Sequence, residues 1–251
     1  MQIISSRLFS QAELRKISNT LDSWKNKIKS NDNLSFIKFG DGEFLCMDGK
    51  VGKNCDHHSY SRELGDKLYD AWFYFNTLNN VYINSWVGHK PEAGINSPSA
   101  RFQEELVKKT KKLRVKFVPQ EILLQNTLSE SKFNLFKTVK YSNRKKIFIG
   151  PARLFAVKNF LNIDKLIKIP LINSFSEYDE ILKNAVSEIE DNCIFLLSAG
   201  MPAKSIIHKL IEKNKNITCL DIGSGFDSLF AGITREGQLD SQTLKKYYTN
   251  L

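Results

Sequence analysis

Residues 193–221 read CIFLLSAGMPAKSIIHKLIEKNKNITCLD. The stretch opens with a continuous apolar run at 193–198, which predicts a buried strand. Ala199 and Gly200 end that run, a helical pattern follows at 202–213, and a second strand is expected at 217–221. Apolar runs without alternation are typical of strands that are covered on both faces. The stretch therefore predicts a βαβ unit with two parallel strands.

The same rhythm of strands and helices extends through the rest of the chain. We expect strands at 34–39, 81–86, 113–118, 146–149 and 166–171, and helices at 11–30, 61–76, 99–109, 153–161 and 178–189. This alternation predicts an α/β fold, Rossmann-like, with a mostly parallel sheet and flanking helices. Because no change in composition marks a linker, we predict a single domain over 1–251. An added helical segment at 1–33 and a polar tail at 238–251 complete it.

The composition is that of a globular protein. Hydrophobic residues make up 41 % and charged residues 25 % of the 251 positions, which is enough apolar material for a core. No long apolar run or secretory leader is visible. The four cysteines (Cys46, Cys55, Cys193 and Cys219) are scattered and never spaced as CxxC, which disfavours a zinc site or a disulfide scaffold. We expect a cytoplasmic protein with reduced thiols.

The charge is strongly positive, with 37 Lys and Arg against 27 Asp and Glu and a net charge of +10. This balance favours an anionic partner, which could be a nucleic acid, an anionic membrane surface or a phosphorylated substrate. The basic residues are spread out, and their densest clusters are at 108–112 and 144–146. No nucleic-acid-binding motif accompanies them, so that interpretation rests on charge alone. A solvated lysine-rich surface has the same composition.

One strand end carries paired acids. Residues 38–43 read KFGDGE directly after the strand expected at 34–39. In parallel α/β sheets, ligands bind where the strands end at their carboxyl side. Asp41 and Glu43, two positions apart on a glycine turn, could reach one Mg²⁺ or Mn²⁺, which prefer oxygen ligands and often share them with phosphates. An ordinary tight turn with solvated acids is the alternative.

Three further strand ends combine small residues with polar ones. They hold Gly150, Pro151 and Arg153, then Ser198, Ala199 and Gly200, and then Asp221 and Gly223. Glycine lets a ligand approach the backbone, and a helix that begins after such a turn can bind phosphate. Asp221 could hold a ribose hydroxyl or the sugar. We expect His57 and His58 to be a solvated loop pair, and His89, after the strand at 81–86, is a candidate for substrate contact.

Several enzyme classes are disfavoured because their motifs are missing. The sequence holds no GxGxxG opening the first βα unit, no GxxxxGK[ST] and no GxSxG. The run DIGSG at 221–225 superficially resembles the glycine loop of methyltransferases. That loop normally follows the first strand of its sheet, whereas here it comes near the C-terminus.

Taken together, these motifs resemble those of the GT-D-type glycosyltransferases, a family once described as a domain of unknown function. The most specific feature is the strand that runs into KFGDGE at 38–43. The turns at 149–151, 198–200 and 220–223 match as well, and the likeness covers 34–230. Lys38 stands where arginine is common in that family, which keeps the charge and loses the forked donor.

The resemblance implies an enzyme that moves a sugar from a nucleotide-diphosphate donor, UDP by default. Its acceptor would be a glycan, glycopeptide or lipid-linked molecule in bacterial surface polysaccharide or glycoprotein synthesis. Asp41 and Glu43 would bind Mn²⁺ or Mg²⁺. Lys38, Phe39, Gly40 and the small-residue turns would bind the donor nucleotide.

The base that activates the acceptor is expected to be Asp227, with Glu177 and His89 as the next candidates. We expect a cytoplasmic location with peripheral contact to the anionic inner face of the membrane, and no nucleic-acid partner. A basic nucleic-acid-binding α/β protein, an S-adenosylmethionine-dependent methyltransferase and a non-catalytic scaffold remain the alternatives.

Overall fold

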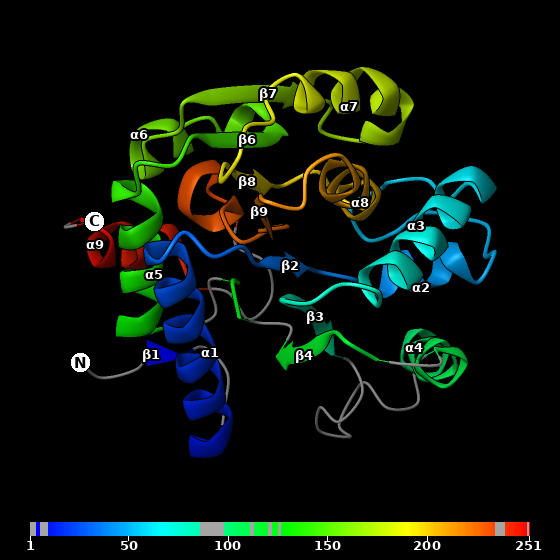
Figure 1. The fold of residues 1–251 in the computed structure, drawn as a ribbon, viewed down its shortest axis with the longest axis horizontal. Helices are drawn as coiled ribbons and strands as arrows, with labels where there is room; N and C mark the ends of the chain where they lie inside the picture. The colour runs from blue at the N-terminus through cyan, green and yellow to red at the C-terminus, as the bar shows by residue number, and fades with distance from the viewer. Residues whose placement is uncertain are drawn as a thin grey trace.

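The computed structural model describes residues 4–5, 10–85, 98–110, 113–119, 122–124, 127–233, 239–249 and 251. A seven-stranded sheet with the order β4-β3-β2-β9-β8-β6-β7 crosses the molecule (Figure 1). Its strands are β2 (Ser35–Ile37), β3 (Val81–Ser85), β4 (Lys116–Pro119), β6 (Lys146–Pro151), β7 (Lys165–Ile169), β8 (Ile194–Leu197) and β9 (Thr218–Asp221). All neighbouring pairs are parallel, which confirms the predicted α/β sheet.

The order of the strands brings distant parts of the sequence together at the centre of the sheet. From β2 the chain moves outward to β3 and β4, whereas the second half builds the other side and ends at β9. There β9 pairs with β2, so that Ser35 lies opposite Cys219 and Phe36 opposite Leu220. The segments that follow β2 and β9 therefore emerge side by side at the same edge.

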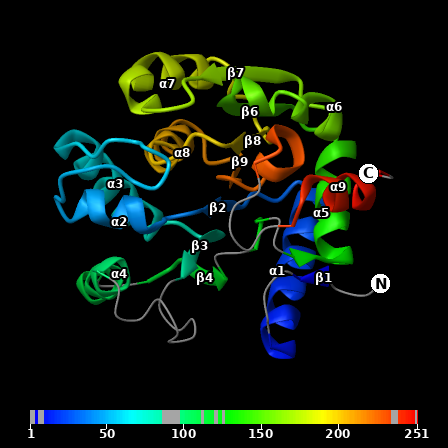
Figure 2. The same cartoon turned by 180° about the vertical axis from the view of Figure 1, so that it is seen from behind.

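Helices cover both faces of the sheet, as the two opposite views show (Figures 1 and 2). One face carries α2 (Asp41–Met47), α3 (Arg62–Phe75), α4 (Pro98–Lys109), α7 (Tyr178–Val186) and α8 (Ala203–Lys213). The other carries α1 (Gln11–Lys29), α5 (Glu130–Tyr141), α6 (Val157–Leu161) and α9 (Ser241–Tyr247). Both chain ends lie on this second side.

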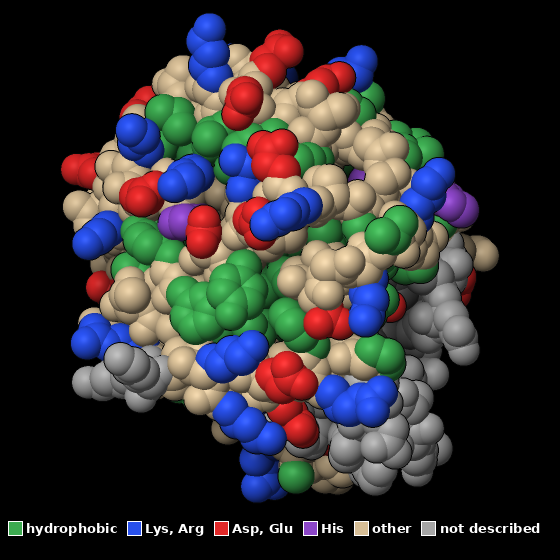
Figure 3. All heavy atoms as spheres, turned by 90° about the vertical axis from the view of Figure 1, so that its right-hand side faces the viewer, with side chains coloured by type: hydrophobic (Ala, Val, Ile, Leu, Met, Phe, Trp, Pro, Cys, Tyr) green, Lys and Arg blue, Asp and Glu red, His purple; other side chains and the backbone are tan. Residues whose placement is uncertain are grey.

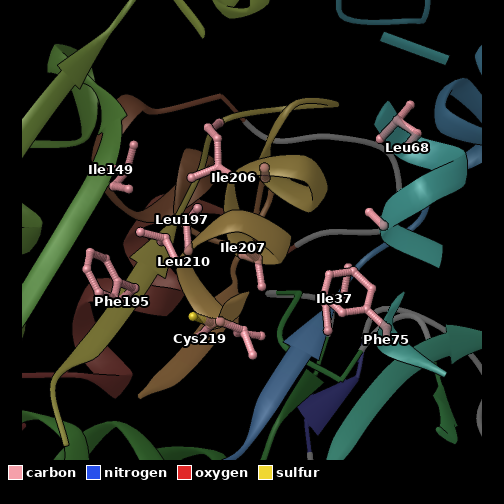
Figure 4. Close-up of a cluster of buried hydrophobic side chains, with 14 of the residues drawn as sticks. Ile37, Leu68, Phe75, Ile149, Phe195, Leu197, Ile206, Ile207, Leu210 and Cys219 are labelled. Carbon is pink, nitrogen blue, oxygen red and sulfur yellow. The ribbon is translucent and has the colours of Figure 1, made fainter. Parts of the chain in front are cut away.

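The two faces share out the apolar residues of each strand. In β8, Phe195 and Leu197 belong to the cluster under α8, whereas Ile194 and Leu196 belong to the cluster under α5 and α6. Successive side chains of a strand point to opposite faces, so a strand buried on both needs apolar residues at every position. Figure 4 shows the first cluster, where strand side chains meet those of α8 and α3. This explains the unbroken apolar runs in the sequence.

Helix α1 matches the predicted helix closely. Ser10 caps it, because its hydroxyl accepts from the backbone N–H of Glu13 while the Glu13 carboxylate accepts from Ser10 in return. Trp24, fully buried, places its ring between those of Phe36 and Tyr82, with centroids 5.2 and 5.1 Å away. The apolar stripe of the helix thus seals the second face of the sheet.

The prediction of a polar tail at 238–251 is wrong. Within that segment α9 packs on the core and buries Leu244 and Tyr248, and Leu251 is also buried. Leu244 and Tyr248 are four positions apart and therefore share one helical face. Two such residues in a lysine-rich segment are too few to predict a buried helix from the sequence. Asp240 caps the helix through the N–H of Thr243.

Other differences concern elements that the sequence pattern hid or displaced. Helix α5 lies in a stretch for which no element was predicted, and β1 (Ile4–Ser5) pairs with β5 (Thr127–Leu128) outside the main sheet. The helix predicted at 153–161 is split into a 3₁₀ turn, Ala152–Leu154, and the short α6. The strand predicted at 113–118 begins only at Lys116.

Charged side chains of both signs are interspersed on the side of the molecule that carries α2, α3, α7 and α8 (Figure 3). On this face the excess of lysine forms no single basic patch. Among the helices in the described ranges, none combines the length and the apolar character needed to cross a bilayer.

Replacing Leu244 with alanine tests the packed tail. The substitution removes a fully buried side chain, so the free energy of unfolding should fall by about 2–5 kcal/mol in urea titrations. The matched control is Lys245→Ala on the exposed side of the same helix, which should change it by less than about 0.5 kcal/mol. Equal, small effects would mean that the tail does not pack on the core.

Candidate active site

A cavity of about 520 Å³ opens where the strands end. Its walls come from the segments after β2, β6, β7, β8 and β9, which all leave the same edge of the parallel sheet. Predicted site residues in the lining are Lys38, Gly40, Asp41, Glu43, Pro151, Arg153, Ser198, Ala199, Gly200, Gly223 and Asp227. Further walls come from 54–58 and 169–172. The structure therefore brings four separate sequence motifs into one site.

Three predicted residues lie outside the described lining. The ring of Phe39 is buried between Phe44 and Trp72, with centroids 5.8 and 5.4 Å away. A Cβ on Gly150 would lie 2.5 Å from the ring of Phe148, so packing accounts for that glycine. Asp221 is fully buried beneath the cavity. Of the two further candidates for the base, Glu177 is not in the described lining and His89 lies outside the described residues.

Asn84 on β3 fixes the start of the acidic motif. Its side-chain oxygen accepts from the N–H of Phe39, and its amide nitrogen donates to the carbonyl of Phe39, both at 2.5 Å. Phe39, which follows β2, is fully buried. A buried amide that serves both groups is the usual way to satisfy such a segment.

The predicted glycine turn is the first turn of helix α2. Glu43 caps this helix, because its Oε2 accepts from the N–H of Gly40 at 2.8 Å. A Cβ on Gly40 would sit 2.8 Å from that same oxygen, and one on Gly42 would sit 2.7 Å from the Cβ of Asn54. The two glycines thus permit the helix cap and the close approach of the loop that bears Asn54.

Beneath the cavity lies a buried charge cluster centred on Lys204. Its ammonium nitrogen is 2.6 Å from Oε1 of Glu43 and 3.1 Å from Oδ2 of Asp221, and it donates to the carbonyl of Gly200 at 3.1 Å. Only 4 % of the Lys204 side chain is exposed. Burial by itself would lower the pKa of Lys204, but the two carboxylates outweigh it and raise this pKa, so the lysine stays charged.

Asp221 connects this cluster to the backbone of two strand ends. Its Oδ2 accepts from the N–H of Lys38 at 3.2 Å, and its Oδ1 accepts from the N–H of Gly223 at 3.1 Å. Burial raises the pKa of the Asp221 carboxyl, and the charge of Lys204 opposes that shift. The predicted contact of Asp221 with a ribose stays a prediction, and what its observed bonds do is join β2 to β9.

Arg153 and Asp227 form an ion pair in the cavity wall. The guanidinium nitrogen Nη2 lies 3.4 Å from Oδ1 of Asp227, whose side chain is only 4 % exposed. Asp227 begins a π-helical turn, Asp227–Ala231, and such turns are frequent at functional sites. The pair places one carboxylate and one guanidinium side by side in the cavity wall.

Ser198 contributes a hydroxyl that has no hydrogen-bond partner among the described residues. Its Oγ is buried, and the residue lines the cavity at the end of β8. Its backbone N–H is held by the carbonyl of Ile149 at 2.8 Å, so the position of the residue is fixed. Buried polar atoms are normally paired, so this hydroxyl points to a ligand or water in the cavity.

The prediction that His57 and His58 are both solvated is wrong for His58. His57 is exposed, whereas His58 is buried and lines the cavity. Nδ1 of His58 accepts from the N–H of Asn173 at 3.0 Å, and its ring lies over Gly200, where a Cβ would come within 3.3 Å. Gly200 also has φ of +65°, which L side chains rarely adopt.

Neither Lys204 nor Asn84 was predicted from the sequence as a site residue. One signal existed for Lys204, since a lysine in the first turn of a helix opposes the helix dipole and needs compensation. Asn84 carried no such signal, because asparagine is common in the turns that follow strands. Residues 169–171 were predicted only as the end of a strand, whereas 169–172 also line the cavity.

The fit of a divalent ion can be judged from the carboxylates. Within the described ranges, no group of three or more His, Cys, Asp or Glu side chains is arranged to hold a metal. Asp41 is exposed to the cavity, whereas both oxygens of Glu43 already face donors. Asp41 therefore fits an ion that completes its shell with ligand phosphates and water, as Mg²⁺ commonly does.

Comparisons with known proteins place the fold. No protein-family model and no curated protein matches the sequence. Two solved structures match with 17 % identity and a TM-score of 0.54, over 95 % of this chain and 93 % of theirs. One is a selenomethionine-substituted structure of domain of unknown function 1792, and the other describes that domain as having a distinct glycosyltransferase fold. The chain shares that fold.

Substituting Asn84 with alanine tests the clamp on the acidic motif. The change removes the side chain that bonds the buried N–H and carbonyl of Phe39, which should cost about 1–3 kcal/mol of unfolding free energy. Chemical denaturation monitored by tryptophan fluorescence measures it, with Asn79→Ala at an exposed position as the control. A variant as stable as the control would show that the Asn84 hydrogen bonds do not stabilise the fold.

Proposed function

We propose that the protein is a glycosyltransferase that takes a sugar from a nucleoside diphosphate donor. The observation that carries this proposal is the convergence of five strand ends on one polar cavity in a fold of the glycosyltransferase type. Because fold alone does not assign an activity, the proposal is based on the chemical groups that line the cavity.

The donor's phosphates and ribose match the groups that line the cavity. Lys38 and Arg153 supply positive charge, and the Ser198 hydroxyl supplies a donor that the described residues leave unused. Gly200 and Gly223 have positive φ, a backbone conformation that favours glycine. These groups favour an anionic ligand with several oxygen acceptors over an apolar one.

A divalent ion is part of the proposal, with Asp41 as the carboxylate best placed to hold it. Such an ion would neutralise the charge that develops on the departing diphosphate. The chain's own part is to offer Asp41 from the first turn of α2, whose position is fixed by the Glu43 cap. Lys38 and Arg153 add fixed positive charge to the same cavity.

Asp227 is proposed as the group that accepts the proton of the acceptor hydroxyl. It lines the cavity, and one of its oxygens lies 3.4 Å from the guanidinium of Arg153. A carboxylate held at a fixed position can act as a general base. Arg153 would also orient it, since the ion pair fixes one of its oxygens.

The acceptor class is proposed from the resemblance and from the rim of the cavity. Leu171, Ile172 and Ile233 line the cavity and are each exposed by more than 40 %. A polar floor with an apolar rim suits an acceptor that has both characters, within the range of glycans, glycopeptides and lipid-linked molecules. A cytoplasmic place with peripheral contact to an anionic membrane is proposed from the charge of +10.

Ligand-induced stabilisation tests the donor class. Melting temperatures are measured with UDP, GDP, CMP, ADP, TDP and S-adenosylmethionine, each with and without Mn²⁺. A ligand that binds only the folded state raises the melting temperature with its concentration. We expect a Mn²⁺-dependent rise with one nucleoside diphosphate, and a smaller rise for Ser198→Ala. A rise with S-adenosylmethionine alone would instead identify a methyltransferase.

Removing the proposed base tests the chemical step. The assay uses the donor nucleotide that the binding panel identifies. Asp227→Asn should lower the rate of sugar transfer by about 10²–10⁴-fold, the usual contribution of a general base. Donor affinity should change little. The control is Glu177→Gln, an acid outside the described lining. Full activity in Asp227→Asn would assign the base elsewhere.

A further inference from the structure

We propose that Lys204 is an internal cation that takes the place a divalent ion would otherwise have between Glu43 and Asp221. Glu43 is then a positioning residue, and Asp41 is the one carboxylate of KFGDGE that can bind a divalent ion. This inference rests on the proposed function only where it concerns the ion at Asp41. The arrangement around Lys204 stands on its own contacts.

The first step is the geometry of helix α2. Asp41 and Glu43 are both inside the helix, which begins at Asp41. Two positions on a helix are separated by about 200° around its axis, so their side chains point in different directions. In the structure Asp41 is exposed to the cavity and Glu43 is 93 % buried. The pair therefore diverges, and one ion is not naturally shared between them.

The second step is that Glu43 is already fully engaged. Its Oε1 lies 2.6 Å from the Lys204 ammonium, and its Oε2 accepts from the N–H that begins α2. Turning this carboxylate toward a metal would break the helix cap and deprive a buried cation of one counter-ion. Breaking a buried charge pair is strongly unfavourable because the remaining charge is left without compensation.

The third step is the match between Lys204 and its surroundings. An ammonium has three N–H donors, and three acceptors surround this one: Glu43 after β2, Gly200 after β8 and Asp221 on β9. Lys204 thus holds three strand ends in register beneath the cavity. A cation at this point is needed for the fold as well as for the charge balance of the two acids.

A consequence distinguishes this account from a purely structural role of the lysine. Removing the ammonium while keeping the side-chain volume leaves Glu43 and Asp221 facing one vacated position. Two carboxylates at one position are a ligand pair for a divalent cation. Lys204→Met should therefore gain affinity for Mn²⁺, whereas a substitution that only loosened the fold would leave affinity unchanged or lower it.

The experiment is a titration of the full chain with Mn²⁺, followed by electron paramagnetic resonance of the free ion. Without nucleotide, we expect Lys204→Met to bind Mn²⁺ at least about tenfold more tightly than the wild type. Lys204→Met/Glu43→Gln should lose that gain. Lys209→Met, on the same helix but half-exposed and paired with Glu212, is the matched control and should behave as the wild type.

A second arm repeats the titration with UDP present. Asp41→Asn should weaken Mn²⁺ binding by about tenfold or more, and Glu43→Gln should leave it unchanged. Equal losses in both variants would overturn the proposal, since Glu43 would then be a ligand. Folded Lys204→Met with wild-type affinity would overturn it as well. If Lys204→Met fails to fold, the comparison of Asp41→Asn with Glu43→Gln still shows whether Glu43 is a ligand of the ion.

The two arms separate this inference from the proposed function. Should none of UDP, GDP, ADP and TDP promote Mn²⁺ binding in the wild type, the proposed donor class fails, while the nucleotide-free comparison of Lys204→Met with its double variant still tests the internal cation. A gain in that arm supports the inference whatever the donor is.

Discussion

The buried ammonium of Lys204 is the constraint on which the cavity depends. A charge with almost no exposure must be paired, and here its partners come from the ends of three different strands. Because β2 and β9 are neighbours at the centre of the sheet, acids that are 178 positions apart in sequence, Glu43 and Asp221, can reach one nitrogen. The topology of the sheet and the charge balance therefore specify the same arrangement.

Above this cluster the cavity divides its groups by their surroundings. The groups that hold the frame are buried and bonded on all sides, as Asn84 and Asp221 are. The groups that line the cavity include Asp41 at a helix start and Ser198 at a strand end, both in fixed backbone. Pre-organised groups of this kind lose little freedom when a ligand binds, which suits a site for charged transition states.

The sequence predicted the parallel sheet because strands buried on both faces leave unbroken apolar runs, a signal that no surface strand imitates. It also predicted which turns meet, since parallel strands end at one edge. It failed where the meaning of a residue depends on tertiary partners. The partners of Lys204 come from three strand ends, which its position in a helix does not reveal. His58 bonds the backbone of Asn173, 115 positions away, and α9 has too few apolar residues for its pattern to predict a packed helix. The acidic pair was recognised, but its helical backbone, which makes the side chains diverge, was not.

The most direct test of the account is a crystal structure of the protein grown with UDP and Mn²⁺. The account predicts a diphosphate in the cavity beside Ser198 and Arg153, Mn²⁺ on Asp41, and Lys204 still between Glu43 and Asp221. A nucleotide bound away from the strand ends would contradict the assigned site. Mn²⁺ on Glu43, with Lys204 displaced, would contradict the role given to the buried lysine.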